Sequence, residues 1–387
     1  MSTSAERYLL VIIMLWAVSI SFGQIKERIS ISGRIIDHQT NNPIPYVNIG
    51  VLDSYVGTSS DDQGKFQLSI PNKLRNSQII FSSIGYKTKP VLISEINSSD
   101  KLVIKLLEDT LNLQSLTFRE SEDPKEILRQ AFAKEDPSSY LIQQYYQGKV
   151  DDLSGKVYYD VEAILHNERK IIDGNIGVSN CATQKKNNLT EGIDNHYFQY
   201  FMFYFNVTDD SYHCDLSADK CLSGLDITMD KYIPYDGKLV YKIDYSFQDT
   251  RKLSLDRKGI KSLAGTAYIE PENLDLIRWV IQGEFEEVSR SKILKAGGKG
   301  YPIDFTWIRN YREVDSKYYL SLLDVIQRNQ QIPVSGAPTT ITQKHSCFSM
   351  DVKFGDQIER NTNCESYDLN NIPYDETFWQ GFKNGVN

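Results

Sequence analysis

Short stretches in which apolar and polar residues alternate fill the region from residue 29 to residue 118. Such a two-residue period is typical of half-buried β-strands, because successive side chains of a strand point to opposite faces. Between two of these stretches, 57–66 predicts a tight turn, with Gly64 at the position that needs a positive φ. The alternation predicts short strands, and hence one β-sandwich, at 29–37, 46–52, 66–70, 78–82, 101–106 and 111–118.

A helical period comes directly after this region. Asp123, Pro124 and Glu126 form an N-cap, a proline at N1 and a glutamate at N3, and the apolar residues after them share one face. The pattern predicts a helix over 123–135 whose apolar stripe is buried on the next sheet. We place a domain boundary near Glu120.

Longer alternating stretches make up the rest of the chain and predict a large antiparallel sheet. We expect the less regular region 179–233 to be an insertion that covers one end of this sheet. The aromatic tail around Trp379 either packs against the sheet or serves as a partner-binding peptide. The predicted strands are 156–165, 238–247, 267–270, 276–281, 301–311 and 318–326.

Four motifs of the first region stand in the order found in the carboxypeptidase-regulatory-like domain family. They are Ile-Ser-Gly-Arg-Ile-Ile-Asp at 31–37, Pro-Ile-Pro-Tyr-Val-Asn-Ile at 43–49, Gly-Thr-Ser-Ser-Asp-Asp-Gln-Gly-Lys-Phe at 57–66 and Phe-Ser-Ser-Ile-Gly-Tyr-Lys at 81–87. Residues 29–118 thus resemble a transthyretin-like accessory domain, common in exported proteins of Bacteroidota, including TonB-dependent receptors. The resemblance implies a fold and an exported protein, not an activity. The remainder of the chain is too short for the large barrel of such a receptor.

A second succession is similar to the curved-sheet family of lipoprotein-localisation factors. It runs from Gly265 through Tyr-Ile-Glu-Pro-Glu-Asn-Leu at 268–274 and Ile-Arg at 277–278 to Tyr-Tyr-Leu at 318–320. The resemblance implies a half-barrel that wraps a helix and holds an acyl chain in its concave face. Five aromatic residues line either that cavity or an ordinary core: Trp279, Phe285, Trp307, Tyr311 and Tyr319.

The predicted fold class is therefore mainly β. A seven-stranded transthyretin-like β-sandwich (24–119) precedes a short helix and a larger, curved antiparallel β-sheet or half-barrel (120–387). Residues 1–23 have the features of a signal peptide, because Arg7 precedes an apolar run shorter than the roughly 20 residues that span a bilayer. We expect cleavage after Gly23, an uncleaved anchor being the alternative, and no transmembrane segment after cleavage. The expected location is the periplasm, with the cell surface or the medium as alternatives.

All five cysteines lie in the second half of the chain, and export permits disulfides. The economical pairs are Cys214 with Cys221 and Cys347 with Cys364, which leaves Cys181 over, although the sequence does not fix the connectivity. The five histidines are scattered singly and no Cys-x-x-Cys occurs. We therefore expect no metal site and no cofactor.

Composition and motifs argue against several functions. The net charge of −8 and the lack of a basic run exclude nucleic acid as the expected partner. No histidine has a glutamate three residues away, as the zinc site of a metallocarboxypeptidase requires, and no Gly-x-Ser-x-Gly elbow occurs. The carboxylate pairs Glu284 with Glu286 and Asp160 with Glu162 each share a strand face, which is typical of a solvated surface. We expect no catalytic residues.

These observations favour a non-enzymatic, exported cell-envelope protein that binds or carries a ligand at the outer membrane. In the sharper form of the hypothesis, the ligand is a lipid or a lipid-linked molecule in the curved sheet. The alternative is a structural or protein-interaction accessory that pairs its edge strands with an envelope protein. A third candidate is an envelope hydrolase that uses Glu284 and Glu286.

Overall fold

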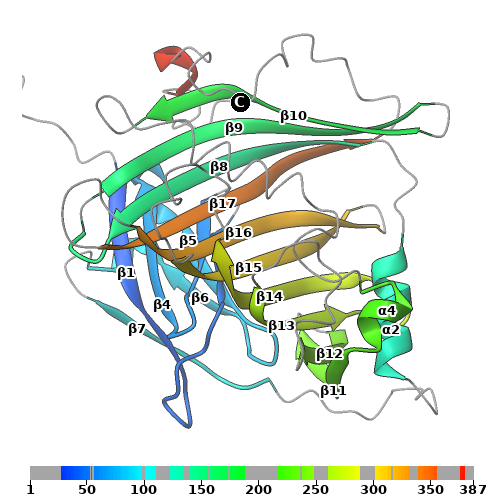
Figure 1. Cartoon of the computed structure of the whole chain (residues 1–387). Helices are drawn as coiled ribbons and strands as arrows, with labels where there is room; N and C mark the ends of the chain where they lie inside the picture. Colours follow the sequence, from blue (N-terminus) through cyan, green and yellow to red (C-terminus); the bar gives the residue numbers. More distant parts are fainter. Residues whose placement is uncertain are drawn as a thin grey trace, which may run out of the picture.

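Three β-sheets make up most of the computed structural model (Figure 1). The predicted signal peptide, the predicted strand 111–118 and the predicted boundary near Glu120 lie outside the described residues, so the division into 24–119 and 120–387 stays a prediction. The structure describes residues 28–52, 54, 56–97, 101–109, 123–134, 140–155, 157–172, 175–187, 216–235, 238–247, 260–287, 301–314, 317–331, 339–354 and 375–379.

The first two sheets face each other as the predicted seven-stranded sandwich. They have the orders β4-β1-β7 and β3-β2-β5-β6, and isoleucines such as Ile31, Ile35 and Ile49 fill the space between them. Two short 3-10 helices, η1 (Asn72–Asn76) and η2 (Ile93–Glu95), complete it. The strands are β1 (Arg28–Asp37), β2 (Asn48–Val51), β3 (Gly57–Ser59), β4 (Lys65–Pro71), β5 (Gln78–Ser82), β6 (Lys89–Leu92) and β7 (Leu102–Leu106).

Strand β6 was not predicted. It holds Pro90, which cannot donate a ladder hydrogen bond, and its sequence does not alternate. Pro90 is tolerated there because β6 lies at the edge of its sheet. It brings the described sandwich to seven strands without the predicted strand 111–118.

The third sheet has ten antiparallel strands in the order β10-β9-β8-β17-β16-β15-β14-β13-β12-β11. Every strand predicted in this region is present. The strands are β8 (Tyr140–Asp152), β9 (Val157–Ile172), β10 (Asn175–Asn187), β11 (Leu225–Tyr235), β12 (Lys238–Phe247), β13 (Ile260–Ile269), β14 (Leu276–Glu287), β15 (Tyr301–Val314), β16 (Lys317–Gln331) and β17 (Thr339–Phe354).

Four strands of this sheet were missed: β8, β10, β11 and β17. The prediction of an insertion over 179–233 is wrong for β10 and β11, which form the two edges of the sheet. The short helix α4 (Asp219–Leu222) in the same region does pack on the sheet, with Cys221 and Leu222 in its core. Strand β11 alternates, with Leu225, Ile227 and Met229 on one side, and this pattern was overlooked. Strands β8 and β17 carry buried polar residues such as Gln144 and Gln343, which hide the alternation.

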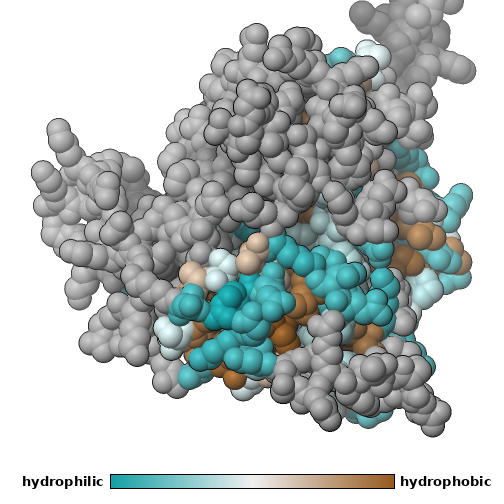
Figure 2. All heavy atoms as spheres, turned by 90° about the vertical axis from the view of Figure 1, so that its right-hand side faces the viewer, coloured by the Kyte–Doolittle hydropathy of each residue, from teal (hydrophilic) through white to brown (hydrophobic). Residues whose placement is uncertain are grey.

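The predicted helix is α2 (Pro124–Ala133), with Asp123 as its N-cap. The Asp123 carboxylate accepts a hydrogen bond from the amide of Lys125 at 3.0 Å. The helix buries Ile127, Leu128 and Ala131 against one face of the large sheet, next to the short helix α4 (Asp219–Leu222). We call this face of the sheet the helix face. Seen from the side on which α2 and α4 lie in Figure 1, the described surface is mostly polar, with smaller apolar patches (Figure 2).

The opposite face of the sheet, which we call the sandwich face, lies against the sandwich. Strand β14 shows how the two faces alternate: Trp279 and Ile281 pack with α2, whereas Arg278 and Val280 point to the other side. The tail also lies on the sandwich face, where Trp379 is buried with residues of β8, β9, β16 and β17. This agrees with the predicted packing of the tail against the sheet.

None of the described helices has the length and apolar content needed to cross a bilayer.

The turn at Gly64 allows a matched test of backbone strain. Gly64 has a φ of 70°, and a Cβ there would lie 2.4 Å from the carbonyl oxygen of Ile35. Gly155 has a φ of 85°, and a Cβ added to it would meet nothing within 4 Å. Gly155→Ala should therefore cost only the left-handed penalty, about 1–2 kcal/mol. Gly64→Ala should cost roughly 2–5 kcal/mol, since overpacking is added. Urea unfolding of both variants checks this, and equal losses would contradict it.

Buried His345 on the helix face should make the stability depend on pH. Its Nδ1 lies 2.8 Å from the hydroxyl of Tyr146, and burial lowers the pKa of His345 to about 3. Between about pH 6.5 and 3 the unfolded chain binds a proton at this position that the folded chain refuses. The free energy of unfolding should then fall by about 1.4 kcal/mol for each pH unit of acidification through that window.

Urea unfolding between pH 7 and pH 4 measures this slope. His345→Gln should reduce the slope by about 1.4 kcal/mol per pH unit, the contribution of one proton. His38→Gln, a change at an exposed histidine, should leave the slope as it is. The same slope in both variants would show that His345 protonates in the folded protein.

Candidate functional site

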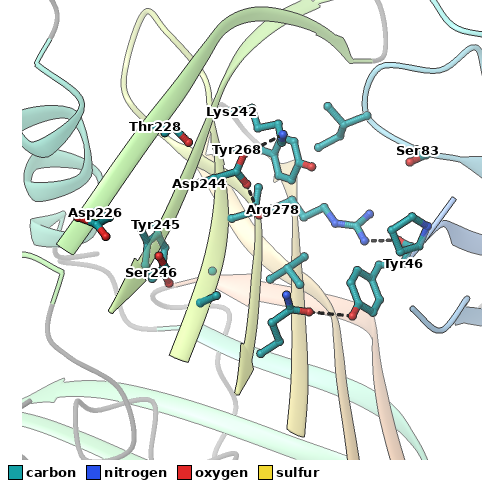
Figure 3. A pocket seen from close by; sticks show the side chains of 17 residues that line it. Tyr46, Ser83, Asp226, Thr228, Lys242, Asp244, Tyr245, Ser246, Tyr268 and Arg278 are labelled. Carbon is teal, nitrogen blue, oxygen red and sulfur yellow. Dashed lines mark hydrogen bonds and ion pairs between the residues drawn. The ribbon is translucent and has the colours of Figure 1, made fainter. Parts of the chain in front are cut away.

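A groove of about 500 Å³ lies where the sandwich meets the outer strands of the large sheet (Figure 3). The sandwich contributes Pro45 and Tyr46, which precede β2, and Ser83 and Ile84, which come after β5. The sheet contributes side chains from β11, β12, β13 and β14. A volume of this size is in the range of small-molecule sites.

The strand register explains why the sheet is hollow at this point. On the sandwich face, side chains of β11–β14 form three rows, each running from one strand to its hydrogen-bonded neighbour. The short side chains lie in the first two rows and form the floor, and long side chains stand at the margins. The rows are Asp226-Ser246-Ala264-Gln282, Thr228-Asp244-Thr266-Val280 and Asp230-Lys242-Tyr268-Arg278.

Two of the charged side chains of the groove, Lys242 and Asp244, are paired with one another. The Nζ atom of Lys242 lies 2.8 Å from a carboxylate oxygen of Asp244 and 3.2 Å from one of Asp230. The hydroxyl of Thr266 donates to Asp244 at 2.6 Å. Burial by itself would lower the pKa of Lys242, but the hydrogen bonds and charges of its two carboxylate partners outweigh burial and raise it. Lys242 therefore stays charged and holds Asp244 in place.

Contacts of Arg278 and Tyr46 hold the sandwich against the large sheet at the groove. An Nη atom of Arg278 donates to the backbone carbonyl of Tyr46, and the Tyr46 hydroxyl donates to the side chain of Gln282 at 3.0 Å. Burial lowers the pKa of Arg278 from its usual value, and the charge of the fully buried Asp324 on β16 acts against that shift. Tyr46 has a φ of 56°, which is uncommon for a bulky residue. These contacts hold it in that conformation, with its ring at the groove (Figure 3).

Further contacts fix the sandwich on the sheet. The amide of Gly85 donates to the carbonyl of Pro234 at 2.8 Å, which extends the edge of β11 into the sandwich. Lys344 on β17 donates to the carbonyl of Ser59 at 3.2 Å. Ile84 of the sandwich is buried with Val240 and Ile277 of the sheet. The wall of the groove is therefore built on a packed contact.

One predicted surface carboxylate belongs to this contact. Glu162 was expected on a solvated strand face with Asp160, but it is buried and lies 3.2 Å from Arg28 of β1. The expectation of a solvated face is wrong for Glu162, because the sandwich covers that part of β9. Glu284, of the other pair, lies 3.2 Å from Lys261, and the side chain of Glu286 lies outside the described residues.

Of the aromatic residues predicted to line a cavity or a core, the four whose side chains the structure describes do not line this groove. Trp279 and Trp307 lie in the apolar cluster of the helix face. The Trp279 ring meets the ring of Phe132 of α2 with centroids 4.7 Å apart, and its Nε1 donates to the hydroxyl of Tyr245 at 2.7 Å. Packing of this kind fits the core alternative for both tryptophans.

The other three aromatic residues are less informative. Tyr319 on β16 is buried, and Tyr311 on β15 is half-buried. The backbone of Phe285 pairs with Ile303 in β15, and its side chain lies outside the described residues. A ligand cavity formed by the five residues stays a prediction.

One of the predicted disulfides is not formed. Cys347 is a free thiol, buried in β17 between Leu323 of β16 and Tyr146 of β8. The expected bridge to Cys364 is wrong because Cys347 points into the packed core of the helix face. Cys221 is buried in the same core, and its predicted partner Cys214 lies outside the described residues, so that pair stays a prediction. The side chain of Cys181 also lies outside them.

The sequence does contain a signal for the groove. The stretch predicted as strand 238–247 carries Lys242, Asp244 and Ser246 on one side, and Arg278 in the stretch 276–281 lies on the side opposite Trp279. The prediction singled out Trp279 and gave these polar residues no role. Only the position of the sandwich, which no local pattern shows, turns that polar face into a groove.

Comparison with known proteins identifies the first part of the chain. A family model, the CarboxypepD_reg-like domain, matches residues 31–117. These residues form a CarboxypepD_reg-like domain. The match agrees with the predicted resemblance over 29–118. No curated protein matches the chain.

Three solved structures are similar to the chain at 9–10% sequence identity. A DUF1329 family protein from Desulfovibrio piger has a TM-score of 0.28 and covers 62% of this chain and 98% of its own. A domain from Vibrio parahaemolyticus, named for outer membrane lipoprotein sorting, has a TM-score of 0.24 with 61% and 94% covered. A protein from Bacteroides fragilis, named as membrane-associated and of unknown function, has a TM-score of 0.16 with 84% and 98% covered. These scores are too low to carry an argument.

Substitutions at Trp279 should separate a core role from a ligand-binding role. Trp279→Phe keeps an aromatic ring against Phe132 but removes the hydrogen bond to Tyr245, and should cost about 1 kcal/mol. Trp279→Ala removes the ring and should cost roughly 3–5 kcal/mol. Denaturant unfolding measures both losses. A Trp279→Ala protein of unchanged stability would contradict the core role.

Proposed function

We propose that this is a non-enzymatic, exported cell-envelope protein that binds a ligand in the groove between its CarboxypepD_reg-like domain and the large sheet. The observation that carries the proposal is the groove itself, which both parts of the chain build. Binding sites occur preferentially where two folded units meet. The hydrogen bonds of Tyr46 with Arg278 and Gln282 fix the geometry of this site before any ligand arrives.

The side chains of the groove favour binding over catalysis. A general acid or base needs a group that exchanges its proton with the substrate. Asp244 instead accepts a hydrogen bond from Thr266 and pairs with Lys242. The Glu284 of the hydrolase hypothesis pairs with Lys261. Carboxylates held in this way are suited to orient a ligand.

The lining also bears on the kind of ligand. Hydroxyl, amide and charged side chains line it together with apolar surface from Pro45, Ile84, Ala264, Val280 and the tyrosine rings. A bare acyl chain in this groove would leave those polar groups without water or partners, which is costly. The lipid hypothesis for the curved sheet stays a prediction about the helix face, and we propose a polar ligand for the groove.

The rival function is pairing of an edge strand with an envelope protein. One observation favours it: β7 lies at the edge of its sheet, and its Val103 is 60% exposed. This strand lies apart from the groove, so the two functions do not exclude each other. The groove is favoured because it is built by contacts from both parts of the chain.

Native mass spectrometry of the full-length, processed protein from an envelope fraction tests the proposal. The expected result is a retained adduct that disappears in Ala264→Tyr, because a tyrosine on the floor fills the groove. Ser262→Tyr is the matched control, since Ser262 is exposed two residues earlier on the same strand and does not line the groove. An adduct that is still retained by Ala264→Tyr would contradict the proposal. A protein partner that survives in both variants would favour the rival.

A further inference from the structure

We infer that the ligand of the groove is a short, neutral oligosaccharide. The inference rests on the proposed function and names the chemical class of its ligand. Three features of the groove carry it: the engagement of its cations within the protein, the hydroxyl groups of its floor and its two tyrosine rings.

The cations of the groove are already engaged within the protein. Lys242 is bound by Asp244 and, from the rim, by Asp230, and Arg278 donates to a backbone carbonyl of the sandwich. Asp226 adds a further carboxylate to the lining. A phosphate or a carboxylate ligand would have to break the contacts of Lys242 or Arg278 to gain a cation of its own. The groove therefore disfavours an anionic ligand.

The hydroxyl groups form a regular array. Ser246 and Thr266 lie on neighbouring strands as diagonal neighbours, about 7–8 Å apart across the sheet, and Thr228 lies opposite Asp244 on the next strand. A hydroxyl can donate and accept hydrogen bonds at once, as can each hydroxyl of a sugar. Asp244 pairs with Lys242 and Thr266, and the Gln282 oxygen accepts from Tyr46, which leaves the remaining lone pairs of Asp244 and the amide N–H groups of Gln282 for sugar hydroxyls. A polyhydroxylated ligand satisfies such an array along its whole length.

The two tyrosines supply the apolar part of the recognition. Tyr46 stands on the sandwich side of the groove and Tyr268 on the sheet side (Figure 3). The hydrogen bond to Gln282 fixes the Tyr46 ring, and Tyr268 packs with the cluster around Ile84. A sugar ring presents C–H groups on its faces and hydroxyls on its edge. Aromatic rings bind the faces, and the hydroxyl array binds the edge.

A peptide fits this groove less well than a sugar. Extended peptides are recognised mainly through hydrogen bonds to the backbone of an edge strand. Here the floor is the face of a sheet, and the backbone of β12, β13 and β14 is paired within that sheet on both sides. Recognition must come from side chains, as it does for carbohydrates.

Saturation-transfer NMR with the full-length, processed protein tests the inference. The probe is a mixture of maltotriose, cellotriose and triacetylchitotriose, with trialanine and inorganic phosphate offered separately. At least one trisaccharide should receive saturation, and its affinity should fall about tenfold or more in Ala264→Tyr while Ser262→Tyr binds as the unchanged protein does. Tyr268→Leu should weaken binding by about the same factor, and Tyr268→Phe, which keeps the ring, should not.

The outcomes separate this inference from the proposed function. No trisaccharide signal, or one that Ala264→Tyr leaves unchanged, would overturn the oligosaccharide. Binding of trialanine or phosphate that Ala264→Tyr abolishes would overturn the sugar class and keep a ligand-binding groove. If the adduct from the envelope fraction is also independent of Ala264→Tyr, the groove function itself falls.

Discussion

A ten-stranded antiparallel sheet whose strands alternate has two faces, and in this protein both need a cover. The whole architecture depends on that constraint. Helix α2 covers the apolar face near β11 through Phe132 and Leu128. The CarboxypepD_reg-like domain covers much of the other face, which is more polar. The groove lies where this second cover leaves part of β11–β14 uncovered, so the site is a product of incomplete coverage.

The two covers are held by different kinds of interaction. The helix is held by apolar burial, which is non-directional and tolerates small displacements. The sandwich is held largely by directional contacts: Arg28 with Glu162, Lys344 with Ser59, Arg278 with Tyr46. A small apolar cluster around Ile84 adds to them. Directional contacts fix orientation more than they add stability, because each replaces a bond to water. This suits a cover that has to place Tyr46 accurately.

Local patterns predicted most of the sandwich and the long regular strands. The turn at Gly64 needs a positive φ that glycine adopts at no cost, and the N-cap at Asp123 follows from its side chain. Strands β8 and β17 were missed because buried glutamines break their alternation. The groove was missed for another reason. Lys242, Asp244 and Arg278 look like solvent-facing residues, and only the docking of a segment some 200 positions earlier in the sequence gives them another role.

The left-handed backbone of Tyr46 has a thermodynamic consequence. The same residue binds Arg278 through its carbonyl, binds Gln282 through its hydroxyl and presents its ring to the groove. Anything that fills the groove touches both the sandwich and the sheet at this residue. Occupancy and docking of the sandwich are then linked equilibria, and a bound molecule raises the free energy of separating the two parts in proportion to the logarithm of its concentration. A bound ligand would thus add to the contacts that hold the two parts together, by an amount that depends on the ligand concentration around the protein.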